Sequence, residues 1–182
     1  MASVVVIYHS GYGHTARQAE AVAAGAKADL IAIDANGDIT EADWTKLDAA
    51  KAIIFGSPTY MGSVSWQFKK FADASSKKWF TQEWKNKVFA GFTNSATMNG
   101  DKFSTIQYLI TLAMQHSGVW VGTGLMPANT KAAKHGDVNY VGGFAGALMT
   151  TPSDASPDEV IKGDLETARL LGARVAEFAA KG

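Results

Sequence analysis

The sequence predicts an α/β fold in which helices cover both faces of a doubly wound, five-stranded parallel sheet. Five short apolar segments alternate with segments of helical character, the pattern of parallel strands joined by right-handed helical crossovers. The first apolar segment is a continuous β-branched run, typical of a strand buried on both faces. The length of 182 residues matches one globular unit, so we expect residues 1–182 to form a single domain.

The first two strands and the helix between them are expected within residues 3–33. Residues 3–8 are apolar and stop at the turn-forming segment 9–13, which predicts the central strand. Residues 14–26 are rich in alanine and meet no helix breaker before Gly25, which predicts a helix. Residues 29–33 then form the second strand.

The next helix, strand and helix are expected within residues 40–78. Thr40 is placed to cap a short helix that ends near residue 50, with Asp43 in the capping-box position. Residues 51–55 predict the third strand. Apolar side chains from Trp66 to Ala72 recur at helical spacing, which predicts a helix that runs to about residue 78.

The second half of the chain supplies the last two strands. Residues 87–92 and 119–121 are expected to be strands, separated by a helix whose apolar positions lie between Ile106 and Met114. Residues 122–151 are rich in glycine and show little periodicity, which is typical of a functional or partner-facing excursion. A final helix is expected from Pro157.

Composition narrows the function classes. Lysine plus arginine and aspartate plus glutamate number 17 each, so the net charge of 0 gives no footprint for nucleic acid. The chain has no cysteine, so redox chemistry requires a bound cofactor, and disulfides and cysteine-held metals are excluded. The apolar start, residues 1–7, is too short for a signal or membrane segment, which predicts a cytoplasmic protein without membrane insertion.

Three loops, residues 9–15, 56–64 and 93–100, follow the first, third and fourth predicted strands. Because ligands of doubly wound sheets lie at the carboxyl ends of the strands, these loops are expected to converge on one site. The first loop precedes a helix N-terminus, where free amides and the helix dipole favour an anion. Its candidate phosphate ligands are Ser10, Gly11, Tyr12, Gly13, His14 and Thr15.

The absence of a lysine in this loop disfavours a nucleoside triphosphate, and a monophosphate fits better. A dinucleotide site is the alternative, since Gly11-x-Gly13-x-x-Ala16 matches that fingerprint and Asp34 ends the second strand.

The other two loops predict contacts to a planar ring. The second loop carries an aromatic and a thioether side chain on a stiffened segment, and the third offers amides and small polar groups. The alternatives are a surface loop that caps the core and an ordinary polar connection. The candidate ring contacts are Pro58, Thr59, Tyr60, Met61 and Gly62 in the second loop, and Thr93, Asn94, Ser95, Ala96, Thr97, Met98 and Asn99 in the third.

The histidines and tryptophans add fewer indications. His116 follows a helix and is either a structural hydrogen-bond partner or a group that assists electron transfer by stabilising charge. His14 is expected to be neutral at a helix N-terminus. No ligand set surrounds His9 or His135, so no metal site is expected. Exposure of Trp79 or Trp84 would indicate a subunit interface or a substrate lid.

These segments together carry a resemblance. Ser10-x-Tyr12-Gly13-His14-Thr15, Phe55-Gly56-x-Pro58-Thr59, Phe92-Thr93-x-Ser95 and Leu112-Ala113-x-x-His116-x-Gly118 occur in one order over most of the chain. In this respect the chain resembles the WrbA family of flavodoxin-like NAD(P)H:quinone oxidoreductases. It differs from the family pattern at Tyr60-Met61, where an Arg-Phe pair is usual, and its third loop lacks the family's run of glycines.

The resemblance implies a flavodoxin-like doubly wound sandwich with strand order 2-1-3-4-5 and with FMN as the cofactor. It implies that two electrons pass from NADH or NADPH to a quinone by a ping-pong mechanism, in a homo-oligomer, either a dimer or a tetramer. It places the FMN phosphate at residues 10–15, the ring and ribityl chain at 59–61 and 93–99, and His116 near the pyrimidine end of the ring. Tyr12 and Trp79 would form the substrate pocket. The rival readings are an electron carrier, a regulatory FMN-binding module, and a reductase of free flavin, azo or nitroaromatic acceptors.

Overall fold

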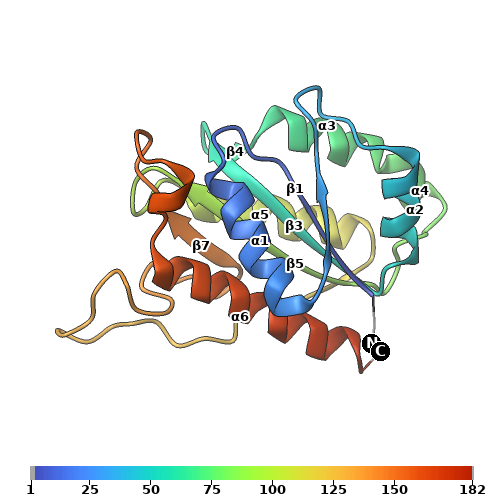
Figure 1. Ribbon diagram of the computed structural model, residues 1–182. Helices are drawn as coiled ribbons and strands as arrows, with labels where there is room; N and C mark the ends of the chain where they lie inside the picture. The colour runs from blue at the N-terminus through green and yellow to red at the C-terminus, as the bar shows by residue number, and fades with distance from the viewer. Residues whose placement is uncertain (1–2, 182) are drawn as a thin grey trace.

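The computed structural model describes residues 3–181 of the chain. Met1 and Ala2, the start of the apolar segment discussed above, and Gly182 lie outside the described residues. The elements are β1 (Val4–Tyr8), α1 (His14–Ala26), β2 (Asp29–Ala32), α2 (Glu41–Ala49), β3 (Ala52–Tyr60), β4 (Ser63–Val64), α3 (Trp66–Ala74), α4 (Ser76–Phe80), β5 (Val88–Ser95), α5 (Lys102–Gln115), β6 (Val119–Trp120), β7 (Ala147–Thr150), the 3₁₀ helix η1 (Pro157–Glu159) and α6 (Lys162–Ala179). Figure 1 shows their arrangement.

The sheet confirms the predicted α/β class and corrects the strand count. Strands β2, β1, β3, β5 and β6 lie side by side in that order and pair in parallel. Within residues 3–181 the sheet has seven strands instead of the five predicted, because β4 pairs antiparallel with the end of β3 and β7 pairs parallel with the end of β5. Strands β3 and β5 also extend beyond the predicted ends, so parts of the second and third loops are strand.

Helices cover both faces of this sheet (Figure 1). Alternate side chains of the central strands point to opposite faces. Val6 and Ile54 face a core that is closed by α1 and α6, whereas Ile7 and Phe55 face a core closed by α2, α3 and α5. Two glycines, Gly25 and Gly172, let α1 and α6 pack closely, since a Cβ at either would lie within 2.0 Å of a carbonyl oxygen of the other helix.

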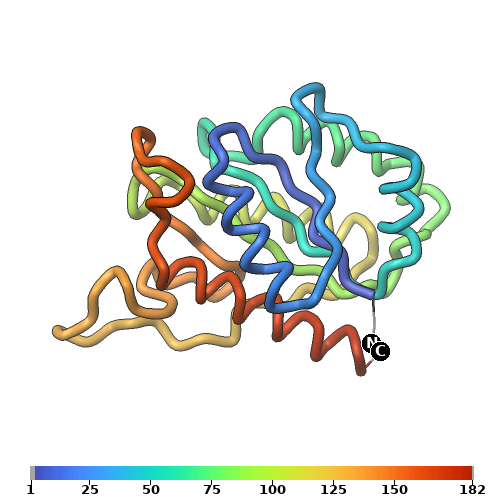
Figure 2. Tube along the Cα trace, viewed as in Figure 1, coloured from blue at the N-terminus to red at the C-terminus, as the bar shows by residue number. Residues whose placement is uncertain are grey.

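The glycine-rich segment interrupts the edge of the sheet. Strand β6 pairs with Val88 and Phe89 at the start of β5, and β7 pairs with residues 92–95 at its end. Residues 121–146, between these two strands, project away from the sheet as an irregular excursion in Figure 2. The predicted excursion of residues 122–151 therefore ends in a strand, β7, which directs the following residues toward the loops at the carboxyl edge.

Candidate functional site

The loops at the carboxyl edge of the sheet line one cleft. They gather at the upper left of Figure 1. The first, second and third predicted loops all contribute, and a fourth segment after β7 joins them. The lining residues are Tyr12, His14, Thr15, Pro58, Thr59, Tyr60, Asn94, Ser95, Ala96, Thr151 and Ser153.

The first loop holds an open helix N-terminus. Ser10 Oγ accepts hydrogen bonds from the amides of Gly13 and Ala16, both at 3.1 Å, which leaves its own O–H free to donate. Helix α1 begins at His14 without a side-chain cap. Within residues 3–181, no acceptor is found for the amides of Tyr12, His14 and Thr15. A ring of unpaired donors at a positive dipole end is suited to a phosphate.

The second loop is a hairpin turn. Met61 and Gly62 have φ angles of 48° and 79°, which place both in the left-handed region at the tip between β3 and β4. The Met61 side chain is fully exposed, and it contacts no core. Tyr60 lies edge-on to Tyr12, with ring centroids 6.3 Å apart, and burial raises the pKa of its hydroxyl.

Hydroxyl groups tie the second loop to the third. Thr59 Oγ1 is hydrogen-bonded to Thr93 Oγ1 and to Thr105 Oγ1, each at 2.8 Å. These bonds join the ends of β3 and β5 to helix α5. Asn94, Ser95 and Ala96 line the cleft, whereas residues 97–99 lie just beyond them and do not.

The fourth segment was missed by the sequence analysis. Thr151 and Ser153 follow β7 and line the cleft beside the first loop. The His14 Nε2–H donates to the Ala155 carbonyl at 2.7 Å, which fastens this segment to the start of α1. Only a weak signal was available in the sequence: Thr150 and Thr151 end a short apolar run, as Thr93 and Asn94 do.

The structure separates His116 and Trp79 from the loop cleft. Both line a second cleft between α3, α4 and α5, and neither reaches the first one within the chain. His116 follows the C-terminus of α5, and the third loop precedes its N-terminus. Within one chain His116 does not line the loop cleft, and both its expected position near the flavin and the expected homo-oligomer stay predictions.

His116 is buried and neutral near pH 7. Its ring packs on Trp84 with centroids 4.5 Å apart, and burial lowers its pKa to about 4. Ser75 Oγ donates to the Ala72 carbonyl, so it accepts the bond from His116 Nε2–H at 2.9 Å. Trp84 is fully buried and donates to Asp48, whereas Trp79 is 44% exposed. These contacts give His116 and Trp84 structural roles.

The position of Asp34 argues against the alternative of a dinucleotide site. Its Oδ1 accepts the amides of Asn36 and Asp38 at 2.8 and 2.9 Å, and these bonds lower its pKa. Asp34 does not line the loop cleft. It closes a turn after β2 instead of facing a ribose.

Two buried polar atoms in the cleft test whether FMN fits. Asn94 Oδ1 and Thr151 Oγ1 have no partner among the described residues, although buried polar groups are normally hydrogen-bonded. Together with the open amides of the first loop, they form a site with donors for a phosphate and polar partners for a ribityl chain or ring. The residues present therefore fit a flavin mononucleotide.

Comparisons with known proteins agree with this geometry. The fold and the site define a flavodoxin-type flavoprotein, and the model of the NADPH-dependent FMN reductase family matches residues 16–132. The chain belongs to this family, and the resemblance to WrbA-like proteins is confirmed by a crystal structure of a "flavodoxin, WrbA-like protein" from Agrobacterium tumefaciens. That structure has 54% identity and a TM-score of 0.84, with 100% of this chain and 99% of that chain covered.

Two relatives carry different names. "Flavodoxin FldP" of Pseudomonas aeruginosa is 57% identical over 98% of this chain and 97% of its own length. An "NAD(P)H dehydrogenase (quinone)" of Sinorhizobium fredii is 33% identical over 100% of this chain and 98% of its own length. Within residues 3–181, no helix is both long enough and apolar enough to cross a membrane. The cytoplasmic location stays a prediction.

Proposed function

We propose that the protein binds FMN in the loop cleft and uses it to pass two electrons from NADH or NADPH to a quinone or a similar small acceptor. The observation that carries the proposal is the set of unpaired donors of the first loop together with the buried, unpartnered atoms of Asn94 and Thr151, all in one cleft at the carboxyl edge of the sheet. Membership in a family described as NADPH-dependent FMN reductases supports a nicotinamide as the electron donor and FMN as the bound flavin.

Each loop has a distinct task in this proposal. The Ser10 O–H and the amides of His14 and Thr15 bind the phosphate. Asn94 and Thr151 supply partners for polar atoms farther along the cofactor. Tyr12 and Tyr60 line the cleft as an edge-on aromatic pair that would pack beside the ring. The chain supplies position and electrostatics, and bound FMN supplies the redox chemistry.

A single cleft would serve both substrates in turn, which corresponds to a ping-pong mechanism. The cleft is open to solvent beside the exposed Tyr12 and Met61, so a nicotinamide and then a quinone can approach the same ring. The same openness supports reduction of free flavin, azo or nitroaromatic acceptors.

A second candidate function is that of an electron carrier. The relative at 57% identity is named a flavodoxin, which favours this candidate. The two candidates differ in whether a nicotinamide reduces the bound flavin directly.

The test is an anaerobic visible spectrum of the FMN-loaded protein with NADH or NADPH, followed by benzoquinone. We expect the flavin band to bleach and then to recover. Bleaching by dithionite but by neither nicotinamide would assign the protein to the carriers. Failure to bind FMN would overturn the proposal altogether.

A further inference from the structure

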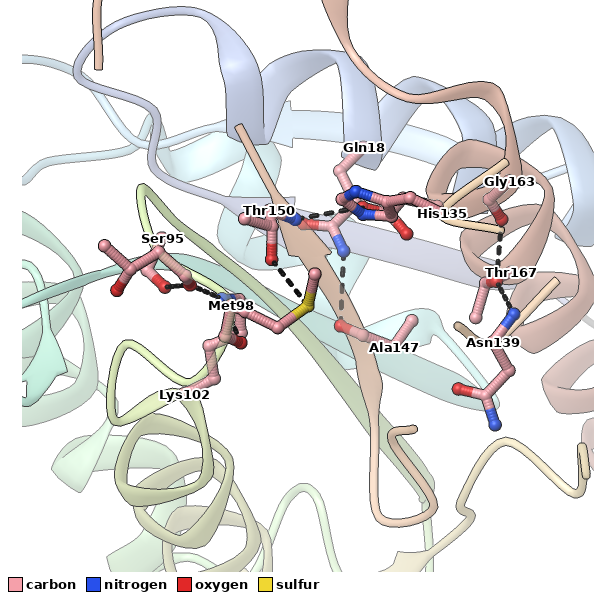
Figure 3. A network of polar contacts seen from close by, with 12 residues as sticks. Gln18, Ser95, Met98, Lys102, His135, Asn139, Ala147, Thr150, Gly163 and Thr167 are labelled. Carbon is pink, nitrogen blue, oxygen red and sulfur yellow. Dashed lines mark hydrogen bonds and ion pairs between the residues drawn. The ribbon is translucent and has the colours of Figure 1, made fainter. Parts of the chain in front are cut away.

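Lys102 occupies an unusual position behind the third loop. It is the first residue of α5 and only 1% exposed. Its ammonium donates to the carbonyls of Thr97 at 2.5 Å and of Met98 at 3.1 Å. Burial and the positive end of a helix dipole both oppose a cation at this place. Figure 3 shows Lys102 directed at the loop beside Ser95 and Met98.

A buried carboxyl group of opposite charge lies near the Lys102 ammonium. Asp164, in the first turn of α6, is 1% exposed and is attracted electrostatically to Lys102. Its Oδ2 accepts from the Thr150 amide at 3.0 Å and is 3.2 Å from His135 Nε2. Burial lowers the pKa of Lys102 to about 8, so the Lys102 side chain is protonated and charged in most molecules at neutral pH. The cation is therefore retained inside the protein close to the loop cleft.

The two carbonyl contacts fix the direction of the loop amides. Peptide bonds are planar and trans, so each carbonyl and the following amide point in opposite directions. The Thr97 carbonyl is held inward by Lys102 and also by Ser95 Oγ at 3.2 Å. The amides of Met98 and Asn99 must then point away from the Lys102 ammonium. Neither has an acceptor within residues 3–181, and the loop continues directly from Ala96 in the cleft wall.

We propose that Lys102 is a positioning residue for the flavin ring, which turns the amides of residues 98 and 99 toward it and favours reduced over oxidised FMN by its buried charge. This inference rests on the proposed FMN site. Reduction by two electrons and one proton adds one negative charge to the ring. A fixed positive charge behind the loop stabilises that state more than the neutral oxidised ring.

The test compares the dissociation constants of oxidised and reduced FMN, measured anaerobically for each variant. Lys102→Met removes the charge and both hydrogen bonds, and Lys102→Gln removes the charge but keeps an amide donor. We expect both to raise the ratio of the reduced to the oxidised dissociation constant at least tenfold. For a two-electron couple this corresponds to a midpoint potential lower by about 30 mV. Lys102→Arg keeps the charge and should keep the ratio within about threefold of the original.

Lys87 provides a matched control. It also donates to two main-chain carbonyls, those of Asp48 and Ala50, both at 2.5 Å, but it lies just before the start of β5, away from the loop cleft. Lys87→Met should leave the ratio unchanged.

The outcomes separate this inference from the proposed function. An equal loss of affinity for both redox states in Lys102→Met and Lys102→Gln would show that Lys102 only supports the loop, and would overturn the inference. An unchanged ratio with full affinity would overturn it as well. Absence of FMN binding in the unaltered protein would instead overturn the proposed function. If Lys102→Met does not fold, Lys102→Gln and Lys102→Arg still decide the outcome, because they differ in charge.

Discussion

The two edges of the sheet differ in whether their partly or fully buried polar groups have hydrogen-bond partners. At the amino edge, the Asp48 carboxylate accepts from Trp84 Nε1 at 2.8 Å and from Lys78 Nζ at 2.5 Å. Lys87 there donates to two carbonyls. At the carboxyl edge, Asn94 Oδ1, Thr151 Oγ1 and several loop amides have no partner among the described residues.

The difference teaches how to distinguish structural polarity from functional polarity. A buried polar group without a partner costs free energy, so a fold that retains several at one edge is expected to recover that cost when a ligand binds. At the amino edge, hydrogen bonds within the chain offset this free-energy cost and stabilise the fold. Among the described residues, His116 Nδ1 is an exception on the amino side, since it is buried without a partner there. The following variants probe both edges.

The largest effect is expected for the first loop. Ser10→Ala combined with Thr15→Ala removes two hydroxyl groups that the proposed function assigns as donors to the FMN phosphate. Each such bond contributes about 1.5 to 3 kcal/mol, so FMN affinity should fall by about 100-fold or more. A fluorescence titration measures this. Thr45→Ala removes a hydroxyl that bonds only within α2, and should leave the affinity unchanged. Equal affinity of the double variant and the original protein would refute the phosphate assignment.

The next effect concerns stability in acid. The pKa of His116 is lowered from 6.5 to about 4 in the folded state, so the unfolded chain binds the proton more readily. The contribution of the neutral His116 to the free energy of unfolding is complete above pH 6.5 and is lost as the pH falls from 6.5 to about 4. The expected loss is about 3 kcal/mol.

Urea unfolding at several pH values measures this loss. His116→Gln cannot titrate, so its stability should change less than that of the original protein between pH 7 and pH 4. Parallel curves for the two proteins would contradict the buried, neutral histidine. A confirmed difference would show that His116 is buried in its neutral form in the folded protein.

Local sequence was sufficient for the site wherever strand ends and turn residues decide the geometry. The apolar runs that end before His9, Gly56 and Thr93 predicted a parallel sheet, and a parallel sheet brings those ends to one edge. Strand β7 was missed because four residues after a glycine-rich segment give a weak local pattern. Its pairing with β5 depends on contacts that are distant in sequence.

Two side chains depend on the folded chain for different physical reasons. Lys102 was not singled out from the sequence, because a lysine that follows an aspartate at the start of a helix is typical of an exposed position, and only the folded loop buries it. His116 was placed near the flavin by the resemblance, and that placement stays a prediction. Helix α5 has 14 residues, and at about 1.5 Å per residue it spans about 20 Å, so its two ends cannot reach the same edge of the sheet.

The smallest expected effect tests the comparison of the two sheet edges most sharply, because stability and FMN affinity should change in opposite directions. Thr151→Val replaces an unpaired buried hydroxyl by a methyl group of similar size. The ligand-free protein should keep or gain stability, while FMN affinity falls by about five- to tenfold, or about 1 kcal/mol. Thr123→Val is the matched control at a buried threonine whose hydroxyl donates to Gly143, and it should lose stability without any change in FMN affinity. Thermal unfolding and FMN titration of both variants measure the two signs. If Thr151→Val instead loses stability and keeps its FMN affinity, then the orphan groups of the carboxyl edge are not reserved for a ligand.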